Sequence, residues 1–267
     1  MIRIYFIAIV AFLLASAIRA QDGVLTRLET GNDSRGWEAV GRLDIDGLGF
    51  CTGALITPSH VLTAAHCLYD KKTGDRIDMA RMEFRAGWRN GRAEAYRKVR
   101  RGVVHPGYTY ADKVPMNRVR HDLALLELQR PVHTTRIAPF ATDIAPRTGD
   151  RIGVVSYAQG RSEVPSLEEV CSVLGQDEGI LIMSCDAEFG ASGAPVFSFR
   201  DGKARIVSII SAKAEAREGK VSLGIELGAS LKLLQARMAT SSSKFLRADS
   251  NQGGAARSVS GAKFVKP

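Results

Sequence analysis

Ser192 is framed by small residues on both sides, in the run Glu-Phe-Gly-Ala-Ser-Gly-Ala-Pro that covers residues 188–195. A serine hydroxyl is a weak nucleophile, and it becomes an effective one when a neighbouring base removes its proton and an acidic group orients that base. Glycine beside such a serine lets the main chain approach a ligand closely. The run therefore indicates either an ordinary turn or a nucleophile that lies against its substrate.

The sequence offers candidates for both partners of this serine. Among the histidines, His66 is preceded by Thr-Ala-Ala and followed by Cys67, so a disulfide at that cysteine would fix the backbone beside the imidazole. Asp122 stands directly before the apolar run Leu-Ala-Leu-Leu, which favours a carboxylate drawn into the interior against a histidine. Each signal is weak alone, but together they supply the base, the orienting acid and the nucleophile that nucleophilic catalysis requires.

The order His, Asp, Ser, with Thr-Ala-Ala-His-Cys, Asp-Leu-Ala-Leu-Leu and Gly-x-Ser-Gly-x-Pro, resembles the chymotrypsin-like (trypsin-fold) serine proteases over residues 37–238. The resemblance implies that Ser192 attacks the scissile carbonyl, that His66 is general base and then general acid, and that Asp122 orients the imidazole. It also implies an oxyanion hole made by the backbone N–H groups of Gly190 and Ser192. The implied fold is all-β, with two six-stranded antiparallel barrels, the site between them and a short C-terminal helix.

The sequence departs from the trypsin pattern in features that bear on how the enzyme is activated and on which branch of the family it resembles. Ala191 stands where trypsin-like zymogens carry an aspartate that receives a new N-terminal ammonium, and no Arg followed by Ile-Val-Gly-Gly occurs near the mature start. We therefore expect an active-site loop that is ordered without this switch. Cys185 lies seven residues before Ser192 instead of four, a spacing similar to that of the bacterial V8-like (glutamyl endopeptidase-like) branch. The stretch from Asp122 to Ser192 is also shorter than in vertebrate trypsins.

Further residues are expected to bind substrate. Asp186 has the offset from the nucleophile of the aspartate that gives trypsin its preference for Arg and Lys, although V8-like relatives can carry Asp there while preferring acidic P1 residues. By resemblance, Ser208 lends its carbonyl to the substrate backbone and its hydroxyl to Asp122. Val207 stands where glutamyl-specific relatives place a histidine, so a buried substrate Glu would be unpaired, and Ile210 narrows a slot that trypsins keep open with Gly. We therefore expect small or medium apolar P1 residues to be favoured over basic and acidic ones.

The first residues and the cysteines indicate an exported protein. Residues 1–20 combine a positive start, a short apolar run and small residues, as in a secretory signal peptide; a retained N-terminal anchor is the alternative. Export to the periplasm or the medium implies an oxidising compartment, in which four cysteines favour two disulfides. Of the three possible pairings we expect the local one, Cys51–Cys67 and Cys171–Cys185. A zinc site is disfavoured because neither pair has Cys-x-x-Cys spacing.

Most of the mature chain is expected to be β-strand, because short runs rich in Val, Ile and aromatic residues alternate with Gly, Pro, Asp and Asn. Helical periodicity appears only at residues 228–239. The chain therefore divides into a signal peptide (1–20), a pro-segment or linker (21–36), a first barrel (37–140), a second barrel with the C-terminal helix (141–239) and a tail (240–267). The tail is rich in Ser, Gly and Ala and is expected to be disordered.

The amino-acid composition limits the classes of molecule that the protein is expected to bind. With 267 residues, 45% of them hydrophobic and 24% charged, the chain can bury a substantial core. The net charge of +9 is not accompanied by a nucleic-acid-binding motif. We expect a monomer that acts on polypeptides, without nucleic acid, stable membrane anchor, cofactor or metal. The loop 69–80 holds Asp70, Asp75 and Asp78 and could bind calcium as in some relatives, but its spacing favours a solvated loop.

The sequence thus predicts a secreted serine endopeptidase that works through an acyl-enzyme intermediate. A catalytically silent protein of the same fold that binds partners is the alternative, and the presence of all three catalytic residue types argues against it. An esterase is disfavoured because residues 190–194 do not read Gly-x-Ser-x-Gly and the order of the three residues differs.

Overall fold

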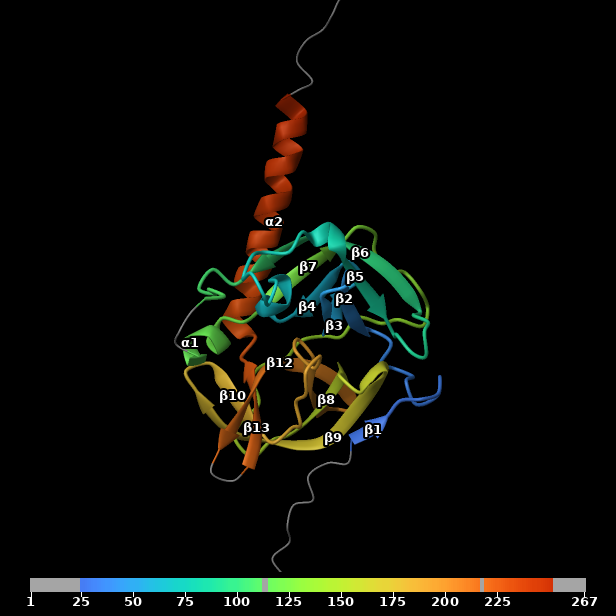
Figure 1. Cartoon of the computed structure of the whole chain (residues 1–267), viewed down its shortest axis with the longest axis vertical. Helices are drawn as coiled ribbons and strands as arrows, with labels where there is room; N and C mark the ends of the chain where they lie inside the picture. Colours follow the sequence, from blue (N-terminus) through green and yellow to red (C-terminus); the bar gives the residue numbers. More distant parts are fainter. Residues whose placement is uncertain (1–24, 112–114, 217–218, 252–267) are drawn as a thin grey trace, which may run out of the picture.

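The computed structural model describes residues 25–111, 115–216 and 219–251, with side chains described as far as residue 240. The expected signal peptide, residues 1–20, lies outside these ranges. The described chain forms two β-structures that lie one above the other in Figure 1.

The first of these is a closed barrel of six antiparallel strands. They are β2 (Val40–Ile45), β3 (Gly49–Thr57), β4 (His60–Thr63), β5 (Met82–Ala86), β6 (Ala95–Val104) and β7 (Ala124–Leu128). Around the barrel the order is β2-β3-β4-β7-β6-β5. In β5 the side chains of Met82, Phe84 and Ala86 are buried while those between them are half-buried, as the two-residue period of a strand requires. The alternating sequence thus gives the barrel its apolar interior.

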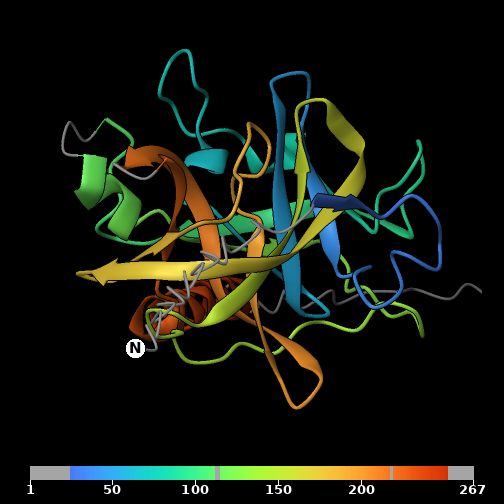
Figure 2. The same ribbon diagram turned by 90° about the horizontal axis from the view of Figure 1, so that it is seen from below.

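The second structure is a sheet in the order β1-β9-β10-β13-β12-β11-β8, in which β8 also pairs with β9. Its strands are β1 (Leu25–Arg27), β8 (Arg151–Ala158), β9 (Arg161–Asp177), β10 (Ile180–Met183), β11 (Pro195–Arg200), β12 (Lys203–Ala216) and β13 (Gly219–Ile225). The β8–β9 pairing closes β8 to β13 into a ring, and β1 adds to β9. Figure 2 shows the long β9 crossing this half of the molecule. The expected all-β fold with two six-stranded barrels is confirmed.

An aromatic cluster joins the two barrels. Trp37 precedes β2, Phe140 lies in the connection between the barrels, and Phe197 belongs to β11. Their ring centroids are 5.0 Å (Trp37–Phe197), 4.7 Å (Phe140–Phe197) and 5.9 Å (Trp37–Phe140) apart. Buried residues of both barrels belong to one continuous apolar cluster. Large rings packed in this way bury much apolar area and hold the two barrels against each other.

A short helix, α1 (Pro115–Arg120), lies just before Asp122. The sequence did not indicate it, because six residues are too few to establish a helical period. Pro115 occupies its first position, where proline needs no N–H partner and its fixed φ suits a helix.

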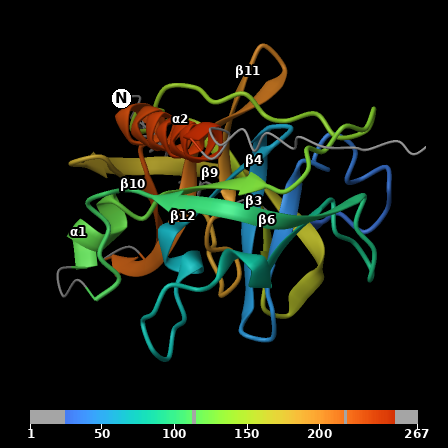
Figure 3. The ribbon, with the colours of Figure 1, turned by 90° about the horizontal axis from the view of Figure 1, so that it is seen from above.

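The C-terminal helix α2 is longer than expected. It runs from Gly228 to Asn251, past the expected end at residue 239, and it buries Leu231, Leu234 and Met238. These side chains cover β6 and β7, beside which α2 is seen nearly end-on in Figure 3. Neither Pro nor Gly occurs between residues 229 and 252, so the sequence contains no stop signal there. Part of the expected tail is therefore helical, and residues 252–267 lie outside the described ranges.

Both expected disulfides are confirmed. Cys51 in β3 is bonded to Cys67 in the 3₁₀ turn Ala65–Leu68, and Cys171 in β9 is bonded to Cys185 after β10. Each bond closes a short loop, of the kind that stabilises by about 3 kcal/mol in the chain-entropy model. Across the described parts of the chain, no helix has both the length and the apolarity needed to cross a membrane.

Candidate active site

His66 and Asp122 meet because they follow and precede paired strands. Thr63 at the end of β4 is opposite Ala124 at the start of β7, so the residues just beyond these ends are neighbours. The His66 Nδ1 atom lies 2.6 Å from Asp122 Oδ2, and the His66 backbone N–H donates to Asp122 Oδ1 at 2.8 Å. A neutral imidazole that donates from Nδ1 keeps a lone pair on Nε2. The carboxylate therefore fixes both the ring and its tautomer, and Nε2 can accept a proton.

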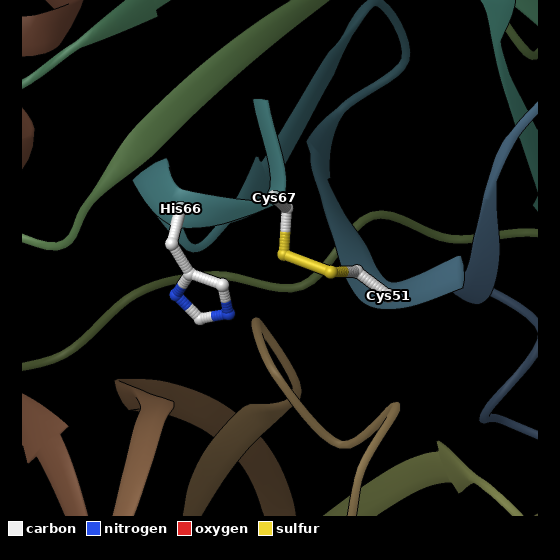
Figure 4. A group of neighbouring side chains, drawn as sticks. All are labelled: Cys51, His66 and Cys67. Carbon is white, nitrogen blue, oxygen red and sulfur yellow. A yellow bond between two sulfur atoms is a disulfide. The ribbon is translucent and has the colours of Figure 1, made fainter. Parts of the chain in front are cut away.

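The imidazole also lies beside the Cys51–Cys67 disulfide, as Figure 4 shows. These three residues are the group of potential metal ligands that lie within 4.8 Å of one another in the described chain. The two sulfur atoms are bonded to each other, however, and are not thiolates; thiolate is the form that binds metal. The disulfide is therefore a support for the histidine backbone, as the sequence predicted.

The expected contact between the Ser208 hydroxyl and Asp122 is wrong. Its Oγ donates to the Ile225 carbonyl at 2.8 Å, whereas the hydroxyl that reaches Asp122 Oδ2, at 2.6 Å, belongs to Ser211. The sequence Ser-Ile-Ile-Ser offers two serines that are three residues apart. The register of β12 against β13 shifts between Ile210 and Ala212, so the two-residue period of a strand does not say which serine reaches Asp122. Resemblance alone selected the wrong one, and the residue that precedes the correct serine is Ile210.

Asp122 is a buried charge whose oxygens are well supplied with donors. It is 3% exposed, and it receives the His66 main-chain N–H, the His66 ring N–H and the Ser211 hydroxyl. A buried carboxylate is tolerated when such donors replace water. The site therefore places a buried carboxyl group, supplied with three donors, next to the imidazole.

Ser192 lies on the loop between β10 and β11 and lines the same cavity of about 380 Å³ as His66 and Asp122. The expected base, acid and nucleophile are thus brought together from the two barrels. No hydrogen bond links Ser192 Oγ to the His66 ring among the described residues. Catalytic contacts of this type are often long before substrate binds.

The two expected oxyanion donors are free of partners in the described chain. Neither the Gly190 N–H nor the Ser192 N–H has an acceptor, while the other amides of residues 191–194 are hydrogen-bonded. Gly190 has a φ of 101°, which side chains strongly disfavour, and a Cβ there would collide with the ring of Phe50. Glycine at this position is therefore required by geometry.

Of the remaining expected binding residues, Ile210 lines the cavity and Asp186 does not. Asp186 is exposed, and its N–H donates to Glu168 Oε2 at 2.9 Å. It follows Cys185, whose bond to Cys171 holds the segment against β9. The offset from the nucleophile therefore does not place this carboxylate on the pocket floor.

Several residues that no motif had indicated also line the cavity. They include the cations Lys71, Arg118 and Lys213. Lys213 Nζ lies 3.6 Å from Glu188 Oε2 and 4.9 Å from the centroid of the exposed Phe189 ring, and Lys71 Nζ lies 5.8 Å from that centroid on the side of the first barrel. Lys213 stands two residues after Ser211. Choosing Ser211 instead of Ser208 as the partner of Asp122 would therefore have pointed to Lys213 instead of Ile210 as a residue of the pocket wall. Three cations thus line the cavity, together with the carboxylate of Glu188.

Tyr108 is a further lining residue, and it is 6% exposed. Its hydroxyl is buried and makes no hydrogen bond to the described protein atoms. Burial, and then the negative charge of Asp122, raise the pKa of this phenol far above its usual range. The tyrosine is therefore a neutral wall of the cavity.

Comparison with known proteins agrees with this geometry. The model of the trypsin-like peptidase domain family matches residues 51–205. Serine protease 23 of Homo sapiens is 31% identical in an alignment of 170 residues that covers 55% of this chain and 42% of that protein. Inactive serine protease 35 of Mus musculus is 26% identical over 219 residues, 60% of this chain and 52% of that protein. The chain thus matches only about half the length of these curated relatives.

Among solved structures, a Glu endopeptidase in complex with MPD superimposes with a TM-score of 0.65. The sequence identity is 19%, and the match covers 82% of this chain and 97% of that one. This likeness concerns the fold alone, and the two-barrel architecture is what the two proteins share.

The revised partner of Asp122 can be tested with two single substitutions. We expect Ser211→Ala to lower kcat/KM for a peptide substrate about tenfold, because a hydroxyl that donates to the buried carboxylate is lost. Ser208→Ala, which removes a buried hydroxyl of the same strand that donates to the Ile225 carbonyl, should change kcat/KM less than about twofold. Equal losses of kcat/KM in the two folded variants would contradict the assignment of Ser211 as the serine that supports Asp122.

Proposed function

Because the chain belongs to the trypsin-like peptidase family, we propose that it is a serine endopeptidase whose catalytic residues are Ser192, His66 and Asp122. The observation that carries the proposal is the buried Asp122–His66 pair, joined at 2.6 Å and facing the same cavity as Ser192. A base that is oriented in this way beside a serine in a glycine-framed loop has the composition needed for acyl transfer.

In the proposed reaction Ser192 Oγ attacks the scissile carbonyl carbon while its proton passes to His66 Nε2. The carbonyl oxygen becomes an oxyanion and receives the N–H groups of Gly190 and Ser192. The C–N bond then breaks, His66 gives the proton to the leaving amine, and an acyl-enzyme remains. Water, deprotonated by the same imidazole, releases the acid and restores Ser192. Throughout, Asp122 keeps its charge and stabilises the imidazolium.

A polypeptide substrate fits the free edge of β12. Strand β11 pairs with β12 only from Lys203 to Ile209, and β13 pairs with its other edge. From Ser211 onward the edge that faces the cavity therefore has unpaired main-chain groups in the described chain. An extended peptide can add to such an edge as a further antiparallel strand. This would carry its scissile bond past Ser192.

Export from the cell is part of the proposal. The leader pattern of residues 1–20 and the two disulfides, Cys51–Cys67 and Cys171–Cys185, support an oxidising destination, periplasmic or extracellular. The exported peptidase would act as a monomer.

The second candidate function is a silent, partner-binding protein of the same fold. Two observations favour it: one of the similar proteins is named an inactive serine protease, and Ser192 Oγ has no hydrogen bond to His66 within the described chain. The intact base–acid pair and the two free amides favour the enzyme, because a silent protein has no need of either.

Substrate preference follows from the cavity wall. Ala187, Ile210 and Ala212 give it apolar surface, and Lys71 and Lys213 line its rim. A basic P1 side chain would meet like charge from Lys71 and Lys213, and the carboxylate of Glu188 that also lines the cavity is already paired with Lys213, so the expected preference for apolar over basic P1 residues gains support. The expected rejection of acidic P1 residues loses its basis, because the ammonium groups of Lys71 and Lys213 line the cavity and can pair with a substrate carboxylate.

The nucleophile is tested by replacing it. We expect Ser192→Ala to abolish hydrolysis of a chromogenic peptide, leaving at most a trace above the uncatalysed rate, because no other group can form the acyl-enzyme. The thermal unfolding midpoint should stay nearly the same, since the side chain is only half-buried. Undiminished turnover by the purified variant would rule out the mechanism.

The preference is tested with matched peptides that differ only at P1, carrying Ala, Leu, Glu or Arg. We expect kcat/KM for the apolar P1 residues to exceed that for Arg by about tenfold, equivalent to about 1.4 kcal/mol of like-charge repulsion and unpaired burial. Arg118→Gln and Lys213→Gln should narrow this gap. Fastest turnover with Arg would show that a carboxylate reaches the pocket after all.

A further inference from the structure

A side chain from the first barrel holds the loop that carries Ser192. Thr52 lies in β3 and is fully buried. Its Oγ1 atom accepts the N–H of Tyr157 at 3.0 Å and lies 2.9 Å from Gly190 O and 3.3 Å from Tyr157 O. A hydroxyl has one proton to donate, and the shorter distance assigns it to the Gly190 carbonyl. Thr52 thus connects its own barrel both to β8 and to the loop.

The carbonyl that Thr52 holds belongs to the peptide between the two oxyanion donors. The N–H of that peptide, on Ala191, donates to Glu188 O at 2.9 Å. With the Gly190 carbonyl bound to Thr52 Oγ1 at its other edge, the peptide plane is fixed from both sides. These two contacts oppose a flip of the peptide and hold the Cα atoms of Gly190 and Ala191, from which the two flanking peptides extend.

The preceding peptide presents the first donor. The carbonyl of Phe189 accepts the N–H of Gln159 at 2.6 Å. In a trans peptide the C=O and the N–H point in opposite directions. The contact with Gln159 therefore turns the Gly190 N–H away from the β8–β9 turn and leaves it without a protein partner.

The following peptide presents the second donor in the same manner. The Ala191 carbonyl accepts the N–H of Ala194 at 2.9 Å, which leaves the Ser192 N–H on the opposite edge. The Ser192 carbonyl in turn accepts the backbone N–H of Thr52 at 2.9 Å. Thr52 therefore contacts the loop twice, once through its side chain before the nucleophile and once through its main chain at the nucleophile.

No charge at the residue before Ser192 can order this loop. Ala191 is fully buried and apolar, so the ion pair that this position supports in trypsin-like zymogens has no counterpart. We propose that Thr52 is a positioning residue: its hydroxyl holds the Gly190–Ala191 peptide so that the oxyanion hole is formed as soon as the barrels pack together. The inference rests on the proposed peptidase function.

The test compares variants of Thr52 in the full-length protein. Thr52→Val removes the hydroxyl and nearly keeps the side-chain volume, Thr52→Ala removes the hydroxyl and reduces the volume, and Thr52→Ser retains the hydroxyl. Thr57→Val is the matched control, since Thr57 lies in the same strand and its hydroxyl contacts His60 at 2.8 Å, on a different surface. We expect kcat to fall about thirtyfold in Thr52→Val and Thr52→Ala with KM within about twofold, whereas Thr52→Ser and Thr57→Val stay within about threefold of the parent.

A second measurement separates positioning from general loss of stability. A peptide boronic acid accepts the Ser192 oxygen on boron while the serine proton moves to His66, and the tetrahedral anion has an oxygen available for the hole. The inhibition constant (Ki) of the boronic acid should rise in Thr52→Val and Thr52→Ala by the same factor by which kcat falls. Unchanged kcat and Ki in either folded variant would overturn the inference. A parent protein that does not turn over peptides would instead refute the proposed function, and the inference with it.

Discussion

The two barrels have to hold the catalytic groups within about 0.5 Å of their productive positions for the chemistry to proceed. His66 and Asp122 are fixed within the first barrel, and Ser192 lies on a loop of the second. The packing of Trp37, Phe140 and Phe197 brings the barrels together. Hydrogen bonds between β3 and the Ser192 loop then set the fine geometry. Close-packed aromatic rings resist displacement, so the relative position of the barrels is maintained without substrate.

Electrostatics imposes the next constraint. A carboxylate at 3% exposure is stable only when donors replace water, and Asp122 obtains one from the main chain, one from the imidazole and one from Ser211. Those same contacts orient the base. The same hydrogen bonds therefore satisfy the buried Asp122 and orient the imidazole that accepts the proton. The bond from Ser211 extends this network into the second barrel.

The sequence predicted the two barrels, both disulfides and the meeting of His66, Asp122 and Ser192 at one cavity, because strand alternation and short motifs are local signals. It failed where a position depends on register or on distant contacts. Ser208 and Ser211 are equivalent as motifs, and only the pairing of β12 distinguishes them. Asp186 has the right offset but is held elsewhere by neighbouring bonds. Thr52 carries no signal, since its role exists only once β3 meets the loop.

The most direct measurement of catalytic competence is stoichiometric labelling of the freshly folded protein with a fluorophosphonate, followed by peptide mapping. The reagent modifies a serine whose proton is removed by a base and whose adduct is stabilised by oxyanion donors. A preassembled site predicts a single adduct, on Ser192, which is absent from urea-unfolded protein and from the His66→Ala variant. Folded protein that stays unlabelled would contradict the account and favour the silent, partner-binding alternative.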